Sequence, residues 1–206
     1  MVKLPAKPSE LRIDDQDVNV LPVGSMLWRI HSTAGDYPQP WNRLRFYGPT
    51  ASRFDPHPPP PGMHEDYGVA YTARDPYTPF AEVYQRTRVI NPQAGAPYLT
   101  AWRTNRVLRL LDLTGNWPVA NGASHVLNTG RHDFCREWAR AIHDHPARVD
   151  GLLHTSAMTG RPAVTLFTPA QDSFPSESVF SRALRDDAVL PLLVAVARRV
   201  NYRLWT

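Results

Sequence analysis

Proline is the residue that most constrains what this chain can fold into. It occupies 21 of the 206 positions and is spread over the whole length. Proline lacks a backbone N–H and fixes its φ angle, so it interrupts helix interiors and central strands. We therefore expect short elements joined by many loops rather than a bundle of long helices. The run Pro58–Pro61 predicts a stiff, extended loop segment.

Hydrophobic periodicity distributes strands and helices along the chain in an irregular order. Thr78 before Pro79 predicts an N-cap and the first turn of a helix, and residues 132–144 have apolar positions at helical spacing. The stretch 179–205, which Pro191 divides, fits either a helix or a strand. Strands are expected at 25–32, 67–73, 101–115, 149–160 and 162–169.

The domain organisation follows from this order of elements. Regular strand–helix–strand alternation is missing, which favours an α+β fold over a doubly wound parallel sheet. The sequence contains no internal repeat and no linker between two cores, so residues 25–206 are expected to form a single domain. Residues 1–24 have little periodicity and predict an extended N-terminal arm, with a short helix near residues 8–14.

Composition and charge narrow the class of protein. Apolar residues make up 42% of the chain and charged residues 20%, which is enough for a sizeable core. The net charge of +4 comes with arginines scattered along the chain, a pattern that does not predict a dedicated nucleic-acid-binding surface. No apolar stretch approaches the roughly 18 residues of a membrane span, and the polar N-terminus does not resemble a secretory signal.

Cysteine and histidine positions carry little sign of redox or metal chemistry. The single cysteine, Cys135, cannot form a disulfide within the chain, so a reducing, cytoplasmic location is expected. Helical spacing around Cys135 favours a buried structural thiol over a nucleophile. His143 and His145 flank Asp144, but no second cluster has ligand spacing, so no metal site is predicted.

Five polar residues stand inside otherwise apolar stretches. Arginine and glutamate are seldom buried without a partner, so their places need an explanation. One interpretation is a buried ion pair between Arg29 and Glu82 that only stabilises the fold. Another is a binding site assembled from distant segments. The five residues are Arg29, Arg53, Tyr71, Glu82 and Ser156.

The second interpretation has a definite chemistry. Arginine forks match phosphate oxygens in a bidentate way. A carboxylate can hold a ribose hydroxyl and stabilise the positive charge that develops on a sugar. Together with an aromatic ring, these groups suit cleavage of the bond between a ribose and a nitrogen base. His31 and His154 lie near the same segments and fit either acid–base groups or structural histidines.

Six short segments, in this order, resemble the RES domain, over about Leu27–Phe167. That family is named for an arginine, a glutamate and a serine, which match Arg29, Glu82 and Ser156. The segments are "LWRIHS", "FYGP…SRFD", "VAYTA…PFAEVY", "LDLTG", "REWARAIH" and "DGLLHTS…AVTLF".

The resemblance implies a toxin with a fold like that of ADP-ribosyltransferases, a mixed β core with surrounding helices. It implies NAD+ as a substrate rather than a permanently bound cofactor, cleaved with water or inorganic phosphate as the acceptor. Protein ADP-ribosylation in the same pocket is the alternative activity. The implied partner is an Xre-like antitoxin protein, and an oligomer within that complex is compatible with the family. The competing functions, nucleic-acid binding or RNA cutting and a silent interaction module, lack a matching pattern.

The resemblance also implies a role for each matching residue. Arg29 and Arg53 would bind phosphates, and Tyr71 would pack on the nicotinamide end. Glu82 would hold the nicotinamide ribose, and Ser156 would hydrogen-bond the ribose or its ligand. We thus expect Arg29, Glu82 and Ser156 to be catalytic.

The second arginine has two candidates. The chain has "YGPTASRFD" where many members have a glycine-rich "GGRW" segment. This departure from the family pattern leaves both Arg53 and its rival Arg45 as matches for the second arginine.

Overall fold

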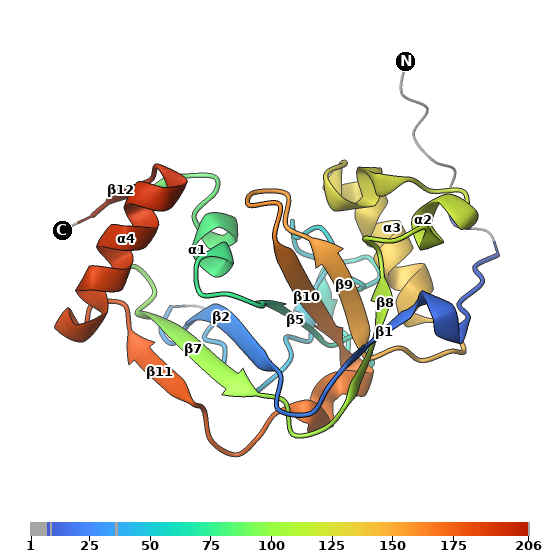
Figure 1. Cartoon of the computed structure of the whole chain (residues 1–206), viewed down its shortest axis with the longest axis horizontal. Coiled ribbons are helices and arrows are strands. Elements are labelled where there is room, and N and C mark those ends of the chain that lie inside the picture. The colour runs from blue at the N-terminus through green and yellow to red at the C-terminus, as the bar shows by residue number, and fades with distance from the viewer. Residues whose placement is uncertain (1–7, 9, 36, 206) are drawn as a thin grey trace.

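The computed structural model describes residues 8, 10–35 and 37–205. Its centre is an eight-stranded sheet in the order β1-β8-β9-β10-β5-β2-β7-β11 (Figure 1). All neighbouring strands are antiparallel except β8 and β9, which are parallel. The strands are β1 (Val18–Leu21), β2 (Met26–Ser32), β5 (Val69–Ala73), β7 (Pro97–Arg103), β8 (Leu108–Asp112), β9 (Gly151–Thr155), β10 (Pro162–Phe167) and β11 (Phe180–Ala183).

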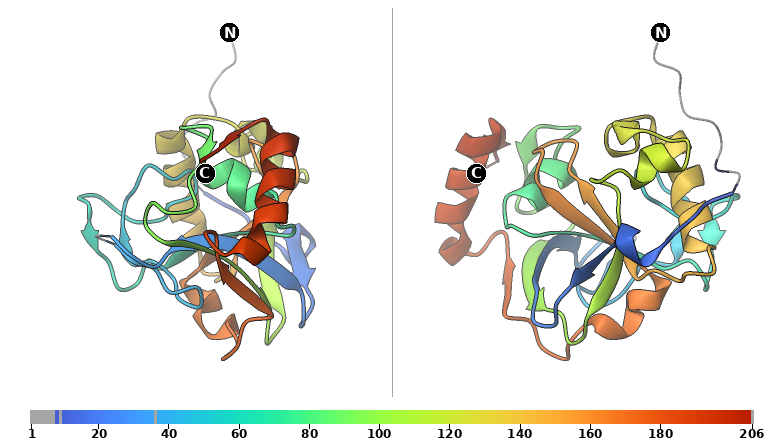
Figure 2. Two further views of the ribbon diagram at one scale, coloured as in Figure 1. Left: turned by 90° about the vertical axis from the view of Figure 1, so that its left-hand side faces the viewer. Right: turned by 45° about the vertical axis from the view of Figure 1, so that its right-hand side comes forward.

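Helices cover the two ends of this sheet. In Figures 1 and 2, α4 lies at one end of the molecule, with α1 beside it, and α2 and α3 lie at the other end. The α-helices are α1 (Thr78–Val83), α2 (Trp117–Ala120), α3 (His132–His143) and α4 (Leu190–Val200). Short 3-10 helices are η1 (Asp15–Asp17), η2 (His125–Asn128), η3 (Thr168–Ser173) and η4 (Asp187–Val189). Two small sheets pair β3 (Tyr47–Gly48) with β4 (Gly62–Met63), and β6 (Val89–Ile90) with β12 (Arg203–Leu204).

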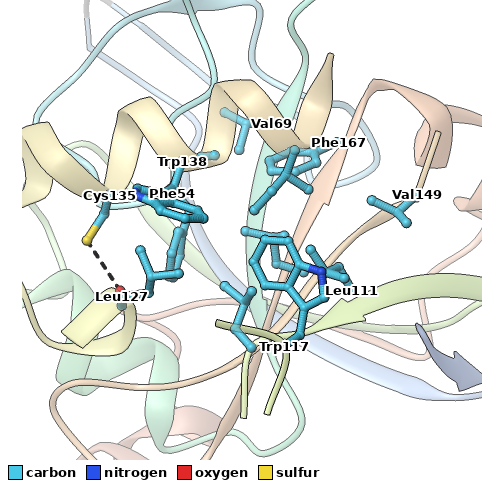
Figure 3. Packing of buried hydrophobic residues seen from close by; sticks show 13 residues of the cluster. Phe54, Val69, Leu111, Trp117, Leu127, Cys135, Trp138, Val149 and Phe167 are labelled. Carbon is cyan, nitrogen blue, oxygen red and sulfur yellow. Dashed lines mark hydrogen bonds between the residues drawn. The ribbon is translucent and has the colours of Figure 1, made fainter. Parts of the chain in front are cut away.

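The core under α3 shows why this helix forms where it does. Cys135, Trp138 and Ile142 fall on one face of α3 and are at most 1% exposed. They pack against Phe54 and Trp117 in the cluster of Figure 3. The thiol of Cys135 donates to the carbonyl of Leu127 at 3.3 Å, and burial raises its pKa. Cys135 is therefore a buried thiol, as expected from the helical spacing, and burial disfavours its thiolate form.

Most of the predicted elements are present. The α+β class is confirmed, and β2, β5, β9, β10 and α3 lie within the segments in which strands and a helix were expected. The proline run Pro58–Pro61 lies in the connection between β3 and β4. In 179–205, β11 comes first and α4 follows, with Pro191 in its first turn. The first backbone N–H groups of a helix have no partner inside it, so the missing N–H of proline costs nothing there. Pro191 therefore begins this helix instead of dividing it.

One expected strand is in fact two. The alternating segment 101–115 contributes to β7 and to β8, with a turn between them at residues 104–107. Arg106 holds this turn by donating to the carboxylate of Asp150 at 2.8 Å and to the carbonyl of Pro169 at 2.7 Å. The prediction was wrong because the four consecutive polar residues at 103–106 were taken as part of one strand, and the partners that stabilise the turn are distant in sequence.

The predicted N-cap of α1 was also wrong. Thr78 is the first residue of the helix and Tyr77 is the N-cap residue, while the carboxylate of Asp75 accepts the hydrogen bonds at the start of the helix. Its Oδ1 accepts from the backbone N–H of Tyr77 at 2.9 Å and of Thr78 at 3.0 Å. The first backbone N–H groups of a helix have no partner inside it. The carboxylate of Asp75 accepts from two of these N–H groups at once, those of Tyr77 and Thr78.

The N-terminal segment is partly within the sheet. Residues 8 and 10–14 form no helix; the short helix near residues 8–14 was wrong for these positions, and the first helical turn is η1. β1 belongs to the segment expected to form an arm, yet it pairs with β8 at one edge of the large sheet. The boundary at residues 24 and 25 stays a prediction. No helix among the described residues has the length and apolar character needed to cross a membrane.

Candidate functional site

An open pocket of about 590 Å³ lies where β2, β5 and α1 meet the loop that runs from Arg45 to Phe54. This volume is within the range of small-molecule sites in proteins. Four of the five predicted site residues line it: Arg29, Arg53, Tyr71 and Glu82. The fifth, Ser156, contacts the pocket through Glu82. The fold therefore brings together residues that are far apart in the sequence.

Arg29 projects from the buried face of β2. Its side chain belongs to a residue that is 7% exposed, and Nη1 donates to the carbonyls of Trp41 and Arg43, both at 3.1 Å. Burial, followed by the charge of Arg45, lowers the pKa of Arg29 to about 10, so it remains protonated at neutral pH. Its buried Nε has no hydrogen-bond partner among the described residues. Arg29 therefore carries a positive charge and a donor that the protein leaves unused.

Glu82 lies on α1 and is half-buried. Its Oε1 accepts a hydrogen bond from the Ser156 hydroxyl at 2.5 Å, and its Oε2 is 3.4 Å from the Gln85 side-chain amide. No ion pair with Arg29 forms within the described part of the chain. The interpretation of Arg29 and Glu82 as a structural pair is therefore wrong, because Arg29 turns to backbone carbonyls and Glu82 to a serine.

Ser156 follows β9 and fixes both a turn and a carboxylate. Its residue is 2% exposed, and its Oγ accepts from the N–H groups of Met158 and Thr159, each at 3.2 Å, while it donates to Glu82. A hydroxyl has one proton and two lone pairs, so these three bonds use its full capacity. The direction of the Glu82 carboxylate is thus set by the end of β9.

Arg45 and Arg53, the two candidates for the second arginine, both line the pocket. Arg45 forms an ion pair with Asp55 at 2.8 Å. Arg53 donates to the carbonyl of Gly130 and lies 3.9 Å from the sulfur of Cys135. No carboxylate of the described residues pairs with Arg53. Its positive charge is therefore not neutralised, whereas that of Arg45 is neutralised by Asp55.

Asp55 organises the wall that carries these arginines. It is fully buried and accepts from the Thr50 N–H at 2.8 Å, the Thr50 hydroxyl at 2.6 Å and Nδ1 of His57. Burial opposes its ionisation, but the bond from His57 and the charge of Arg45 hold the pKa of Asp55 well below its usual range. The carboxylate therefore stays charged and fixes the loop between Arg45 and His57.

Tyr71 provides the aromatic part of the lining. It belongs to β5, the strand that lies between β10 and β2 in the sheet, and its side chain lines the pocket. Burial, with the negative charge of Asp55 as the second cause, raises the pKa of Tyr71 far above its ordinary value. The phenol is therefore neutral at any physiological pH and can serve as a ring surface or a hydrogen-bond donor.

The two neighbouring histidines are structural in their hydrogen bonding. His31 lies between the carbonyl of Gln39 at 2.8 Å and the hydroxyl of Thr100 at 3.0 Å. His154, which lines the pocket, is 3.0 Å from the Thr165 hydroxyl. Burial is the largest cause that lowers the pKa of each to about 4, so both rings are neutral at pH 7.

Several pocket residues were not predicted from the sequence. They lie in loops or at the first or last residue of a helix or strand, where no periodic pattern marks them. Only Ser52 was marked, because it precedes Arg53 in the "SRFD" segment. Among the described residues, no group of three His, Cys, Asp or Glu could hold a metal ion. The unpredicted lining includes Gln39, Thr50, Ser52, Thr78, Gln85, His132 and Thr155.

The arrangement favours an anionic ligand that carries a sugar. Two guanidinium groups without carboxylate partners attract phosphates, and a carboxylate held by a hydroxyl lies in the same pocket. The ring of Tyr71 and the apolar residues Phe54 and Val69 supply surface for a planar group.

Comparisons with known proteins give separate evidence on the fold and on the family of this chain. Among the solved structures, one similar chain is in the crystal structure of the M. tuberculosis MbcT-MbcA toxin-antitoxin complex. It is 17% identical, with a TM-score of 0.53, and the match covers 88% of this chain and 94% of that chain. At this identity the likeness concerns the fold, and it agrees with a single α+β domain. No curated protein sequence matches the chain.

The family follows from a match of a different kind. The model of the family described as the RES domain matches residues 26–189, which include every residue of the pocket. Because this match extends over most of the chain, the protein belongs to the RES domain family.

Proposed function

We propose that this chain is a toxin that degrades NAD+ by cleaving the nicotinamide–ribose bond, with water or inorganic phosphate as the acceptor. The observation that carries the proposal is the convergence of Arg29, Arg53, Tyr71 and Glu82 on one pocket, with Ser156 bonded to Glu82. Membership of the RES domain family supports it.

The arginines account for the binding of a dinucleotide. The diphosphate of NAD+ needs cationic donors, and guanidinium groups provide them in a planar fork. Nε of Arg29 has no partner among the described residues, and Arg53 has no carboxylate. A phosphate oxygen would satisfy both needs, which lowers the cost of keeping Arg29 buried.

Glu82 accounts for the chemical step. When the bond between nicotinamide and ribose breaks, its electron pair leaves with the nicotinamide nitrogen, and positive charge spreads over C1 and the ring oxygen of the ribose. The carboxylate of Glu82, oriented by Ser156, stabilises that charge. Water then bonds to C1 and loses a proton to give ADP-ribose, or phosphate bonds there to give ADP-ribose phosphate.

The test is turnover by the purified protein. Incubation with NAD+, with and without phosphate, followed by separation of the products, should show free nicotinamide and one of the two ADP-ribose products. Glu82→Gln should keep the fold and lower kcat by about 100-fold or more, since it removes the charge but little volume. Glu177→Gln, the same change at an exposed position, is the matched control. Near-normal turnover by folded Glu82→Gln would end the assignment.

The same assay separates hydrolysis or phosphorolysis from protein ADP-ribosylation. With NAD+ labelled in the adenosine part, a transferase would place the label on a protein, whereas the proposed enzyme releases it as a small molecule. Label on protein together with no small-molecule product would replace the first proposal by the second.

The proposed partner is an Xre-like antitoxin that blocks the pocket. An enzyme that consumes NAD+ in its own cell needs such restraint, and the similar solved structure is a toxin-antitoxin complex by its title. Expression of this chain alone should stop growth and deplete NAD+, and co-expression of the neighbouring gene product should restore both. Normal growth and NAD+ levels on expression alone would contradict the toxin assignment.

A further inference from the structure

The C-terminal part of the chain, residues 190–205, lies beyond the segment that matches the RES domain model. It nevertheless packs against the helix that carries Glu82. Phe80 of α1 shares a buried cluster with Leu193 and Val196 of α4 and with Tyr202. Figures 1 and 2 show α4 and α1 side by side at one end of the molecule. The segment is therefore placed to influence the position of Glu82.

Tyr202 makes the most direct contact between the two parts. α4 ends at Val200, and the left-handed backbone of its C-cap residue Asn201 (φ 53°) turns the chain so that Tyr202 points back toward α1. Its residue is 7% exposed, and its hydroxyl donates to the carbonyl of Ala81 at 3.1 Å. The guanidinium of Arg88 lies 5.8 Å from the centre of its ring. Ala81 is the residue immediately before Glu82.

This bond satisfies a carbonyl that the helix itself leaves free. The last carbonyls of any helix lack a partner inside it, and α1 has only six residues. Phe80 O accepts from the N–H of Tyr84 at 3.0 Å, and Glu82 O accepts from the side chain of Gln85 at 2.9 Å. The carbonyl between them, on Ala81, is the one that Tyr202 occupies.

A helix this short has no stability of its own in water, so its position depends on its tertiary contacts. Asp75 holds the first turn, at the N–H groups of Tyr77 and Thr78. Tyr202 holds the last turn, next to the residue whose carboxylate meets Ser156 at 2.5 Å. A small rotation of the last turn would move that carboxylate away from the reacting sugar.

We propose that Tyr202 is a positioning residue for Glu82, and that the α4–β12 segment thereby sets the rate of the bond-breaking step. The inference rests on the proposed function, since it assigns Tyr202 to the same reaction. Tyr202 does not line the pocket and so does not contribute to the binding of NAD+.

The chain offers a matched pair of substitutions to test this. Tyr202→Phe removes the hydroxyl that bonds to Ala81 and keeps the ring in its cluster. Tyr84→Phe removes a hydroxyl from the same cluster, but one that donates to the carbonyl of Asn91 at 3.2 Å. We expect Tyr202→Phe to lower kcat about tenfold, the loss of one hydrogen bond, with KM within twofold. Tyr84→Phe should keep both constants within twofold of the wild type.

Thermal unfolding of both variants shows whether the comparison is made between folded proteins. A tenfold fall of kcat in Tyr202→Phe alone supports the proposal. Provided that the wild type cleaves NAD+, any of three results overturns the proposal. These are an unchanged kcat in Tyr202→Phe, an equal fall of kcat in both variants, or a rise of KM in place of the fall of kcat. If the wild type itself does not cleave NAD+, the proposed function fails first and the role of Tyr202 falls with it.

Discussion

Ser156→Ala is the change that best tests how the fold controls the carboxylate. The hydroxyl is buried and makes three hydrogen bonds, one to Glu82 and two from the backbone N–H groups of Met158 and Thr159. Alanine keeps the backbone and the Cβ but removes all three. The carboxylate then loses its shortest contact and is free to rotate about the end of α1.

The bonds allow the size of the effect to be worked out. A hydrogen bond to a charged group contributes about 1.5–3 kcal/mol, and about 1.4 kcal/mol corresponds to a factor of ten in rate. If the whole bond to Glu82 acts in the transition state, kcat should fall about ten- to hundredfold. Met158 and Thr159 are half-buried, so water can replace part of what their N–H groups lose. We therefore expect the free energy of unfolding to drop by only about 1–2 kcal/mol.

Two measurements on one variant separate these effects. NAD+ turnover gives kcat and KM, and urea denaturation gives the free energy of unfolding. Ser176→Ala removes an exposed hydroxyl and should change neither. If folded Ser156→Ala keeps full kcat while Glu82→Gln loses it, then the serine stabilises only its turn, and the reasoning that it orients Glu82 is refuted.

Three further predictions concern charge, packing and pH. Arg29→Lys keeps the charge but not the planar fork, so kcat/KM for NAD+ should fall at least roughly tenfold; equal kinetics would mean that Arg29 supplies only positive charge. Gly151→Ala would place its Cβ 2.1 Å from the backbone oxygen of Thr165, and should lower the free energy of unfolding by about 3 kcal/mol. Gly62→Ala, with no atom nearer than 3.9 Å, is its control, and equal melting temperatures would contradict this packing. The pKa of buried His154 is lowered to about 4 in the fold, so between pH 6.5 and 4 the unfolded chain binds more protons and stability falls as the pH drops through this window, by on the order of 3 kcal/mol. Urea denaturation at pH 7 and pH 4.5 should show this loss, and His154→Gln should reduce it; the same loss in wild type and variant would contradict a buried, neutral ring.

Local pattern was enough to predict the elements whose stability is local. The helix at 132–144 has its apolar residues on one face, and β2, β5 and β10 lie in apolar runs bounded by turn residues. The turn at 104–107 could not be predicted, because Arg106 bonds to Asp150 and Pro169 from distant parts of the chain. The same holds for β1, an edge strand that the partner strand β8 stabilises.

The candidate site could be predicted as a set of residues but not as a geometry. Polar residues inside apolar stretches were a sufficient signal for Arg29 and Glu82, and the structure places both on one pocket. Their relation could not be inferred, because it depends on backbone carbonyls at Trp41 and Arg43 and on the end of β9. Asp55 was missed altogether, since a lone aspartate in a proline-rich loop has no periodic signature.

The structure supplies a physical argument for choosing between Arg45 and Arg53. Both line the pocket, but an anion that approaches Arg45 must compete with Asp55, a buried carboxylate 2.8 Å away whose low pKa keeps it charged. Arg29 and Arg53 meet only carbonyl groups and a thiol among the described residues, so their charges are open to a ligand. A diphosphate brings about two negative charges, which these two arginines can balance. Arg45 then has a different role, because its pairing with Asp55 holds the loop that presents Arg53.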